Sequence, residues 1–275
     1  IFLKRPPRKS PKTATVNPNV DHFGYRQDQL HAEEVPLATI AERVGTPCYV
    51  YSRATLERHY RVFDDAFGDW PHHICFSVKA NGNLAVLQVL ERLGAGFDIV
   101  SMGELDRVLA SGGRASDVVF SGVGKSSDEI ARALRAGVRI LSIESGQELD
   151  RVNAAALAAN TKAPIAFRIN PDVDPKTHPY IATGLRENKF GVSAADALGL
   201  YRKADAMAGI EVAGIGCHIG SQLTEVDPFC DALEKVLDLV EALAQNGITL
   251  QHLDLGGGVG IRYSDETPPD PKDYV

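Results

Sequence analysis

The chain has 275 residues, 44% of them hydrophobic, and 36 acidic side chains outnumber 29 basic ones to give a net charge of -7. This length and composition suit one large or two modest globular domains and exclude wholesale disorder. An acidic chain is a poor candidate for binding DNA or RNA, and no stretch approaches the ~20 apolar residues of a membrane-spanning helix. We therefore expect neither a nucleic-acid nor a membrane partner.

The cysteines indicate a reducing compartment. None of Cys48, Cys75, Cys217 and Cys230 forms a C-x-x-C pair, and no histidine lies at zinc-ligand spacing from them. We expect no metal site. Scattered thiols, together with an N-terminus that carries no apolar signal-peptide core, predict a cytoplasmic protein.

Residues 1–20 form a basic, proline-rich tail without a single acidic side chain. Such a segment cannot bury a core and is expected to be disordered. The rest of the chain carries 24 basic against 36 acidic side chains. Because the chain begins with Ile1, a cloning remnant or an upstream extension is favoured over a targeting peptide or a contact for an acidic partner.

From about residue 46 a short apolar run followed by an amphipathic segment recurs about every 20 residues. The apolar runs are continuous rather than alternating, which is typical of parallel strands covered by helices. We predict seven such strands, at 73–79, 96–100, 118–121, 138–143, 164–170, 212–218 and 250–255.

The starts and ends of the intervening helices are also readable. Ser101, Ser126 and Ser145 each come just after a strand and are followed three residues later by glutamate, the pattern of a capping box. Gly112 and Gly137 lie where a helix C-terminus favours a positive φ. Three matches in phase with the strands predict successive βα units.

Seven βα units favour a (β/α)8 TIM-type barrel with seven of its eight strands present. The alternative is an open doubly wound sheet, whose dinucleotide-binding form needs Gly-x-Gly-x-x-Gly after an early strand. The early strand here ends instead in Val78-Lys79-Ala80-Asn81, and the glycine cluster follows the seventh strand. In barrels the site lies at the C-terminal ends of the strands.

The predicted strand ends include Lys79, whose role can be interpreted in two ways. Burying an ammonium group is costly, so a partly buried Lys79 would have a lowered pKa and could form a Schiff base with an aldehyde. Alternatively, Lys79 reaches solvent or pairs with Asp98, which ends the next strand.

Two further features at the strand ends also have two readings each. Gly256-Gly257-Gly258 can converge backbone amides on a phosphate, or form a flexible turn. His218 can stack on a planar ring or move a proton, or serve as a structural residue; His178, in a loop, is a weaker candidate. Together these residues would supply an amine that binds an aldehyde, a ring that stacks on another ring, and backbone amides that bind a phosphate. Pyridoxal phosphate has all three of these groups, so the pattern predicts this cofactor.

Several motifs in order carry a family resemblance. They are Phe76–Asn81, Phe97–Leu105, His178–Gly184, Glu187–Gly191 and Cys217–Gln222. On these motifs the chain resembles the fold-type III pyridoxal-phosphate decarboxylases, which have an alanine-racemase-like barrel. The third, fourth and fifth motifs are similar to those of the diaminopimelate decarboxylase branch.

The resemblance implies a role for each candidate site residue. Lys79 would hold the cofactor covalently and His218 would stack on its pyridine ring, and these two are the catalytic candidates. The other implied cofactor contacts are Ser221, Gly256, Gly257 and Gly258 to the phosphate, with Asp98 and Arg168 lining the pocket.

The implied reaction is the pyridoxal-phosphate-dependent decarboxylation of meso-2,6-diaminopimelate to L-lysine, the last step of lysine biosynthesis. Lys79 would then be available for proton transfer. The alternatives are a related diamino-acid decarboxylase or racemase, and a non-catalytic cofactor-binding barrel.

The family also has an eighth strand with a Glu-Pro-Gly-Arg motif and a C-terminal β domain, neither of which is in this sequence. The resemblance therefore implies an N-terminal portion of an enzyme that is a homodimer at full length. Residues 21–45 would be an extension that packs with the β domain, and 46–275 the incomplete barrel. Strands one and seven would have unpaired edges.

Overall fold

The computed structural model describes residues 21–173 and 190–275. The basic tail, the His178–Gly184 motif and all but the last two residues of the Glu187–Gly191 motif lie outside the described residues. Within the described part, no helix is both long enough and apolar enough to cross a membrane.

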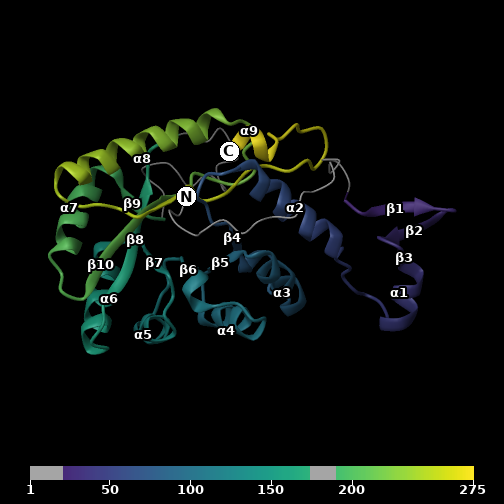
Figure 1. Ribbon diagram of the computed structural model, residues 1–275, viewed down its shortest axis with the longest axis horizontal. Coiled ribbons are helices and arrows are strands. Elements are labelled where there is room, and N and C mark those ends of the chain that lie inside the picture. Colours follow the sequence, from purple (N-terminus) through teal and green to yellow (C-terminus); the bar gives the residue numbers. More distant parts are fainter. Residues whose placement is uncertain (1–20, 174–189) are drawn as a thin grey trace.

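Residues 21–45 form a small unit that the sequence patterns did not predict. Its elements are β1 (Phe23–Arg26), β2 (Gln29–Ala32), β3 (Val35–Pro36) and α1 (Leu37–Val44), with the three strands paired antiparallel in that order. Gln27 and Asp28 both have positive φ, as a two-residue hairpin turn between twisted strands requires. Figure 1 shows this unit at one end of the molecule, beside the start of the barrel.

The rest of the described chain is built on one parallel sheet. Its strands are β4 (Cys75–Ser77), β5 (Gly96–Ile99), β6 (Val118–Phe120), β7 (Ile140–Ile143), β8 (Ala163–Asn170), β10 (Ile210–Cys217) and β11 (His252–Asp254). They pair in chain order from β4 to β11, and the short β9 (Val192–Ser193) also pairs with β8. All seven predicted strands are confirmed, and β4 and β11 are the two ends of the strand order.

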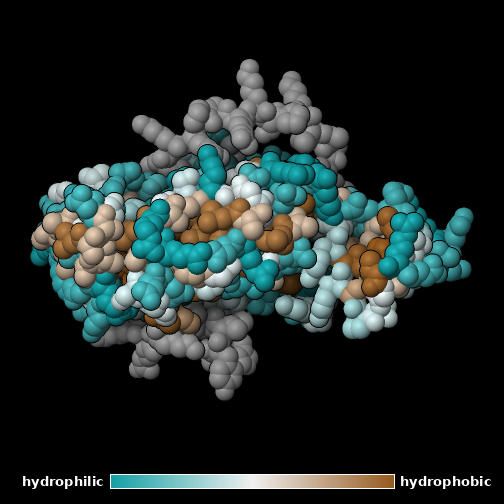
Figure 2. Space-filling view, turned by 90° about the horizontal axis from the view of Figure 1, so that it is seen from below, coloured by the Kyte–Doolittle hydropathy of each residue, from teal (hydrophilic) through white to brown (hydrophobic). Residues whose placement is uncertain are grey.

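Helices lie before, between and after the strands, and those that connect consecutive strands cover one face of the sheet. They are α2 (Arg53–Ala66), α3 (Leu84–Leu93), α4 (Met102–Ala110), α5 (Ser127–Ala136), α6 (Gly146–Ala158), α7 (Ala194–Asp205), α8 (Asp227–Gln245) and α9 (Pro271–Tyr274), with 3-10 turns η1 (Val78–Ala80) and η2 (Ala115–Asp117). In Figure 1, α3 to α6 lie in a row along one side of the strands. Figure 2 shows this helix-covered side as a mixture of hydrophilic and apolar side chains.

The predicted N-caps are confirmed, but only one of them is a full capping box. The serine before each of α4, α5 and α6 accepts a hydrogen bond from the backbone N–H of the glutamate three residues on. The reciprocal bond forms at Ser126–Glu129. Glu104 and Glu148 instead reach one residue further back, and each accepts from the backbone N–H just before its N-cap, at 2.7 and 2.8 Å.

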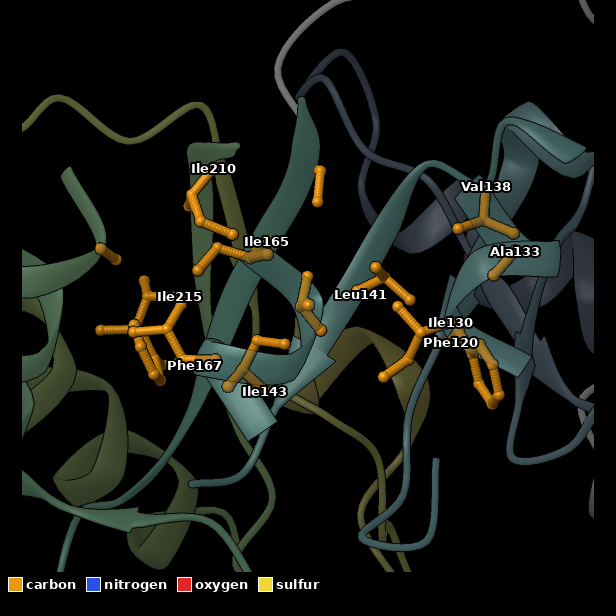
Figure 3. Packing of buried hydrophobic residues seen from close by; sticks show 14 of the residues in the cluster. Phe120, Ile130, Ala133, Val138, Leu141, Ile143, Ile165, Phe167, Ile210 and Ile215 are labelled. Carbon is orange, nitrogen blue, oxygen red and sulfur yellow. The ribbon is translucent and has the colours of Figure 1, made fainter. Parts of the chain in front are cut away.

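The core lies between the sheet and these helices. Figure 3 shows Phe120 of β6 beside Ile130 of α5, and Phe167 of β8 beside Ile215 of β10. Phe167 and Tyr201 are both fully buried, with ring centroids 4.8 Å apart, and the Tyr201 hydroxyl donates to the Gly214 carbonyl at 2.8 Å. Full burial of side chains of this size contributes roughly 1.5–3 kcal/mol each, so this layer fixes the strand ends that carry the site.

Candidate active site

The parallel sheet brings the predicted site residues to one edge. Asp98 lies in β5 and Arg168 near the end of β8, while Lys79 and His218 come just after β4 and β10. The glycine run 256–258 begins two residues after the end of β11. Because parallel strands end on the same side of a sheet, residues almost 180 positions apart in sequence converge there.

Lys79 is exposed, which agrees with the interpretation that it reaches solvent and not with the interpretation that it is partly buried. The reason is local: η1 begins as soon as β4 ends, so Val78 is buried and Lys79 projects beyond the sheet. The alternative pairing with Asp98 does not form between these described residues, because the Asp98 carboxylate accepts from Ser77 Oγ at 2.9 Å and from Ser121 Oγ at 2.6 Å. Lys79 therefore lies exposed just after β4, where its positive charge acts on His218.

His218 is a neutral ring held by the glycine run. Burial, followed by the positive charges of Arg168 and Lys79, lowers the pKa of His218 from 6.5 to about 4. The backbone N–H of Gly257 points at His218 Nδ1 from 3.4 Å. Nδ1 is then the acceptor of the neutral ring and Nε2 carries the proton.

The glycine run can adopt its path only because it lacks side chains. Gly256 and Gly258 have φ of 69° and 110°, a region that costs other residues energy. A Cβ on Gly258 would lie 1.9 Å from the Gly220 carbonyl oxygen, and one on Gly256 would lie 2.6 Å from the Cys217 carbonyl oxygen. The run thus packs directly against the segment after β10 that contains Ser221.

Two of the three amides in this run already face side chains. The Gly256 N–H donates to Asp254 Oδ1 at 2.7 Å, and the Gly257 N–H faces His218. Burial, with a smaller effect from the Asp98 carboxylate, raises the pKa of Asp254, while the bond from Gly256 opposes that rise. The carboxyl group of Asp254 therefore supports the run from inside the barrel.

The sequence patterns missed a buried carboxylate beside Arg168. Glu144, directly after β7, lies 3.8 Å from Arg168 Nη1, and its side chain is only 2% exposed. The preceding βα unit, formed by β6 and α5, contributes a buried ammonium group: Lys125 Nζ donates to Glu148 Oε1 at 2.8 Å. A detectable signal existed: each of Lys125 and Glu144 immediately precedes a predicted N-cap serine.

The comparison with protein families settles the class of this barrel. The family described as "Pyridoxal-dependent decarboxylase, pyridoxal binding domain" matches residues 53–275. The chain belongs to the pyridoxal-dependent decarboxylase family. The resemblance inferred from the motifs is confirmed, and so is the expectation of pyridoxal phosphate as the cofactor.

Two curated relatives of this pyridoxal-dependent decarboxylase domain are similar over most of the chain. The diaminopimelate decarboxylases of Pseudomonas aeruginosa and Haemophilus influenzae are 57% and 56% identical to it over 256 residues, or 93% of this chain and 62% of each relative. The chain thus spans about three-fifths of the length of these relatives.

Solved structures agree with the fold. Diaminopimelate decarboxylase from Helicobacter pylori, complexed with L-lysine, matches with a TM-score of 0.84 at 39% identity, covering 86% of this chain and 60% of that one. The M. jannaschii enzyme matches with a TM-score of 0.87 at 37% identity, covering 92% and 61%. The prediction of an alanine-racemase-like barrel with seven strands present is confirmed.

The described residues of this pyridoxal-binding domain fit its cofactor. An exposed amine at Lys79 and a neutral imidazole at His218 meet the needs of an aldehyde and an aromatic ring. Arg168 Nε is buried and has no hydrogen-bond partner among the described residues, so a donor remains for a further group. The roles of the individual residues, Ser221 included, stay predictions.

Proposed function

We propose that this chain binds pyridoxal phosphate through Lys79 as the barrel domain of a diaminopimelate decarboxylase, which converts meso-2,6-diaminopimelate to L-lysine. The observation that carries the proposal is the meeting of Lys79, a neutral His218 and the glycine run at one sheet edge. The 57% identity to the Pseudomonas aeruginosa diaminopimelate decarboxylase supports this substrate over other diamino acids.

When bound, pyridoxal phosphate supplies an electron sink that stabilises the carbanion left by loss of CO2. The chain's own residues do the rest. Lys79 Nζ would hold the cofactor covalently. Once released, the same nitrogen would give or take a proton. His218, neutral near pH 7 and protonated on Nε2, would lie against the ring without adding a positive charge.

The remaining contacts would orient the cofactor. Ser221 and the 256–258 run would hold the phosphate, where the amide of Gly257 can turn from His218 towards an anion. Asp98 keeps its two serine hydroxyl donors and Arg168 its carboxylate neighbour, so both would line the pocket in fixed positions.

We extend the proposal to the domain organisation. Residues 46–275 would be the barrel and 21–45 an extension that packs with a C-terminal β domain, in a cytoplasmic homodimer whose substrate is a small amino acid. The support is that β4 and β11 end the strand order, which leaves the position of an eighth strand between them.

Cofactor attachment is tested by adding pyridoxal phosphate to the chain, reducing with borohydride and mapping the labelled peptide. We expect label on Lys79, and loss of both label and the absorbance change in Lys79→Arg. Lys203→Arg is the matched control, since Lys203 is a surface lysine paired with Asp150. Label on other lysines with Lys79 unmodified would contradict the proposal.

Substrate choice is tested in a chimera that continues the chain with the C-terminal part of the Pseudomonas aeruginosa relative. We expect it to release L-lysine from meso-diaminopimelate and to leave ornithine, arginine and carboxynorspermidine largely unchanged. A chimera that bound pyridoxal phosphate but preferred one of those other substrates would support the related-decarboxylase alternative. Cofactor binding without turnover of any substrate would support the non-catalytic barrel.

A further inference from the structure

Glu144 is a buried carboxylate with defined partners on both oxygens. Oε1 accepts from the backbone N–H of Gly122 at 3.2 Å and lies 3.8 Å from Arg168 Nη1. Oε2 accepts from the backbone N–H of Gly191 at 2.9 Å. A buried charge is tolerated only with such partners, so Glu144 joins the loops after β6 and β7 to β8 and to the segment before β9.

A second buried charge pair holds the backbone of Glu144. Glu148 Oε2 accepts from the Glu144 N–H at 2.8 Å, and its Oε1 accepts from Lys125 Nζ at 2.8 Å. Lys125 Nζ also donates to the carbonyls of Gly122 and Ser142, each at 2.6 Å. All three N–H groups of the Lys125 ammonium thus have an acceptor. The backbone is held on both sides of the Glu144 side chain, by Lys125 at Ser142 and by Glu148 at the Glu144 N–H.

Arg168 connects this network to the candidate active site. One side of its guanidinium faces Glu144, and its centre lies 5.0 Å from the centroid of the Phe190 ring. Arg168 of β8 pairs with Gly216 of β10, and His218 follows Gly216 by two residues. At this place the charge of Arg168 is the second cause of the lowered pKa of His218. Arg168 is therefore placed between the buried carboxylate of Glu144 and His218, the residue proposed to lie against the cofactor ring.

We infer that Glu144 is a positioning residue: it fixes the Arg168 guanidinium beside His218, and so prepares the pocket for pyridoxal phosphate. The Lys125–Glu148 pair supports Glu144 rather than contacting the pocket. The inference rests on the proposed function for the cofactor, but the placing of Arg168 is a property of the chain by itself.

The first test needs no cofactor. The side-chain Nε–H resonance of Arg168 is assigned by its loss in Arg168→Met and followed in Glu144→Gln, which keeps the size of the side chain but removes its charge. We expect the resonance to move and its exchange with water to rise about tenfold or more, as for loss of a charge-assisted contact. An unchanged resonance would overturn the inference, whether or not the chain binds pyridoxal phosphate.

The second test is a double-mutant cycle on the affinity for pyridoxal phosphate. Glu144→Gln and Arg168→Met should each weaken binding about tenfold, and the double variant no further, because residues that act through one another are not additive. Additive losses, or an unchanged affinity in Glu144→Gln with a lowered melting temperature alone, would show a merely structural role and refute the inference.

Controls separate the possible failures. Glu104→Gln is the control, since the Glu104 carboxylate also accepts a backbone N–H, that of Val100, and this change should leave the affinity unchanged. If Glu144→Gln does not fold, Glu144→Asp, which keeps the charge on a shorter side chain, enters the same cycle. A shifted Arg168 resonance in a chain whose wild type fails to bind pyridoxal phosphate would reject the proposed function and retain the positioning role.

Discussion

Two lysine–carboxylate pairs of similar length lie in opposite surroundings. Lys125 and Glu148 are 2.8 Å apart with side chains 1% and 3% exposed, whereas Lys203 and Asp150 are 2.6 Å apart with side chains 44% and 54% exposed. Water screens the second pair, and surface pairs contribute about 0–1 kcal/mol. In the first pair, removal of one partner leaves the other charge buried without a counter-charge. The N–O distance alone therefore does not tell which pair contributes more to stability.

Replacing Lys125 by Met is expected to lower the free energy of unfolding by about 3–5 kcal/mol, because the Glu148 carboxylate loses its buried partner. The matched change Lys203→Met should cost less than about 1 kcal/mol. Urea unfolding followed by circular dichroism measures both. Equal losses in the two variants would mean that Lys125 is solvated in solution.

His218 predicts a dependence of stability on pH. Its pKa is about 4 in the folded chain against 6.5 for an ordinary histidine, so the unfolded chain takes up the proton first. The stabilisation is fully present above pH 6.5 and is lost as the pH falls towards 4. At pH 5 the loss is about 2 kcal/mol relative to pH 7.

The variant His218→Gln removes this proton uptake. Between pH 7 and 5 it should lose about 2 kcal/mol less unfolding free energy than the wild type, and NMR titration should place the wild-type pKa near 4. Because other histidines are shared by both proteins, the difference isolates His218. Parallel pH profiles for the two proteins would contradict the burial of this ring.

At the scale of elements, the strands of the barrel were predictable and the small sheet was not. Barrel strands are apolar on both faces, so continuous runs marked all seven of them. Strands β1 to β3 have only two to four residues, and β1 is mostly exposed, so no apolar pattern marks them. The position of Lys79 was predicted, but the sequence left its burial or exposure open, because a 3-10 turn after β4 has no sequence signal of its own.

The candidate site shows the same division. Residues read from strand ends, such as His218 and the glycine run, were found because strand order fixes where they lie. Glu144 was missed because its partners are backbone N–H groups of Gly122 and Gly191. Such contacts depend on the three-dimensional path of loops, so the place of Glu144 just before an N-cap serine did not by itself indicate them.

The loop after β11 offers a test within one element. Gly258→Ala places a side chain at φ 110° and 1.9 Å from the Gly220 carbonyl oxygen, so we expect a loss of about 2 kcal/mol or more in unfolding free energy. Gly257 has open space around its Cβ position, and Gly257→Ala should change stability by within about 0.5 kcal/mol. Thermal unfolding compares them. Equal stability of the two variants would show that the run does not pack against Gly220.

At the scale of the whole molecule, hydrogen bonds join the described 21–45 unit to the start of α2. Figure 2 shows apolar side chains gathered over this unit at one end of the molecule, and Val35 and Val44 are among the exposed ones. The connection to the barrel is polar: Glu33 Oε1 accepts from Ser52 Oγ at 2.8 Å and from the Ala54 N–H at 2.9 Å. These two hydrogen bonds lower the pKa of Glu33, and the bond from Ala54 has the larger effect. The contact therefore stabilises the ionised form of Glu33.

This contact predicts how the molecule comes apart. Glu33→Ala should free the 21–45 unit and speed chymotrypsin cleavage after Tyr49 or Tyr51, both exposed in the connection to α2, while the fragment that begins near Arg53 resists further digestion. Glu34→Ala is the control, because the Glu34 carboxylate pairs with Arg26 inside the small sheet. We expect about a five- to tenfold faster first cut for Glu33→Ala, since loss of hydrogen bonds worth about 1–1.5 kcal/mol raises the opened population by that factor. Equal rates for the two variants would mean that apolar packing, rather than Glu33, joins the unit to the barrel.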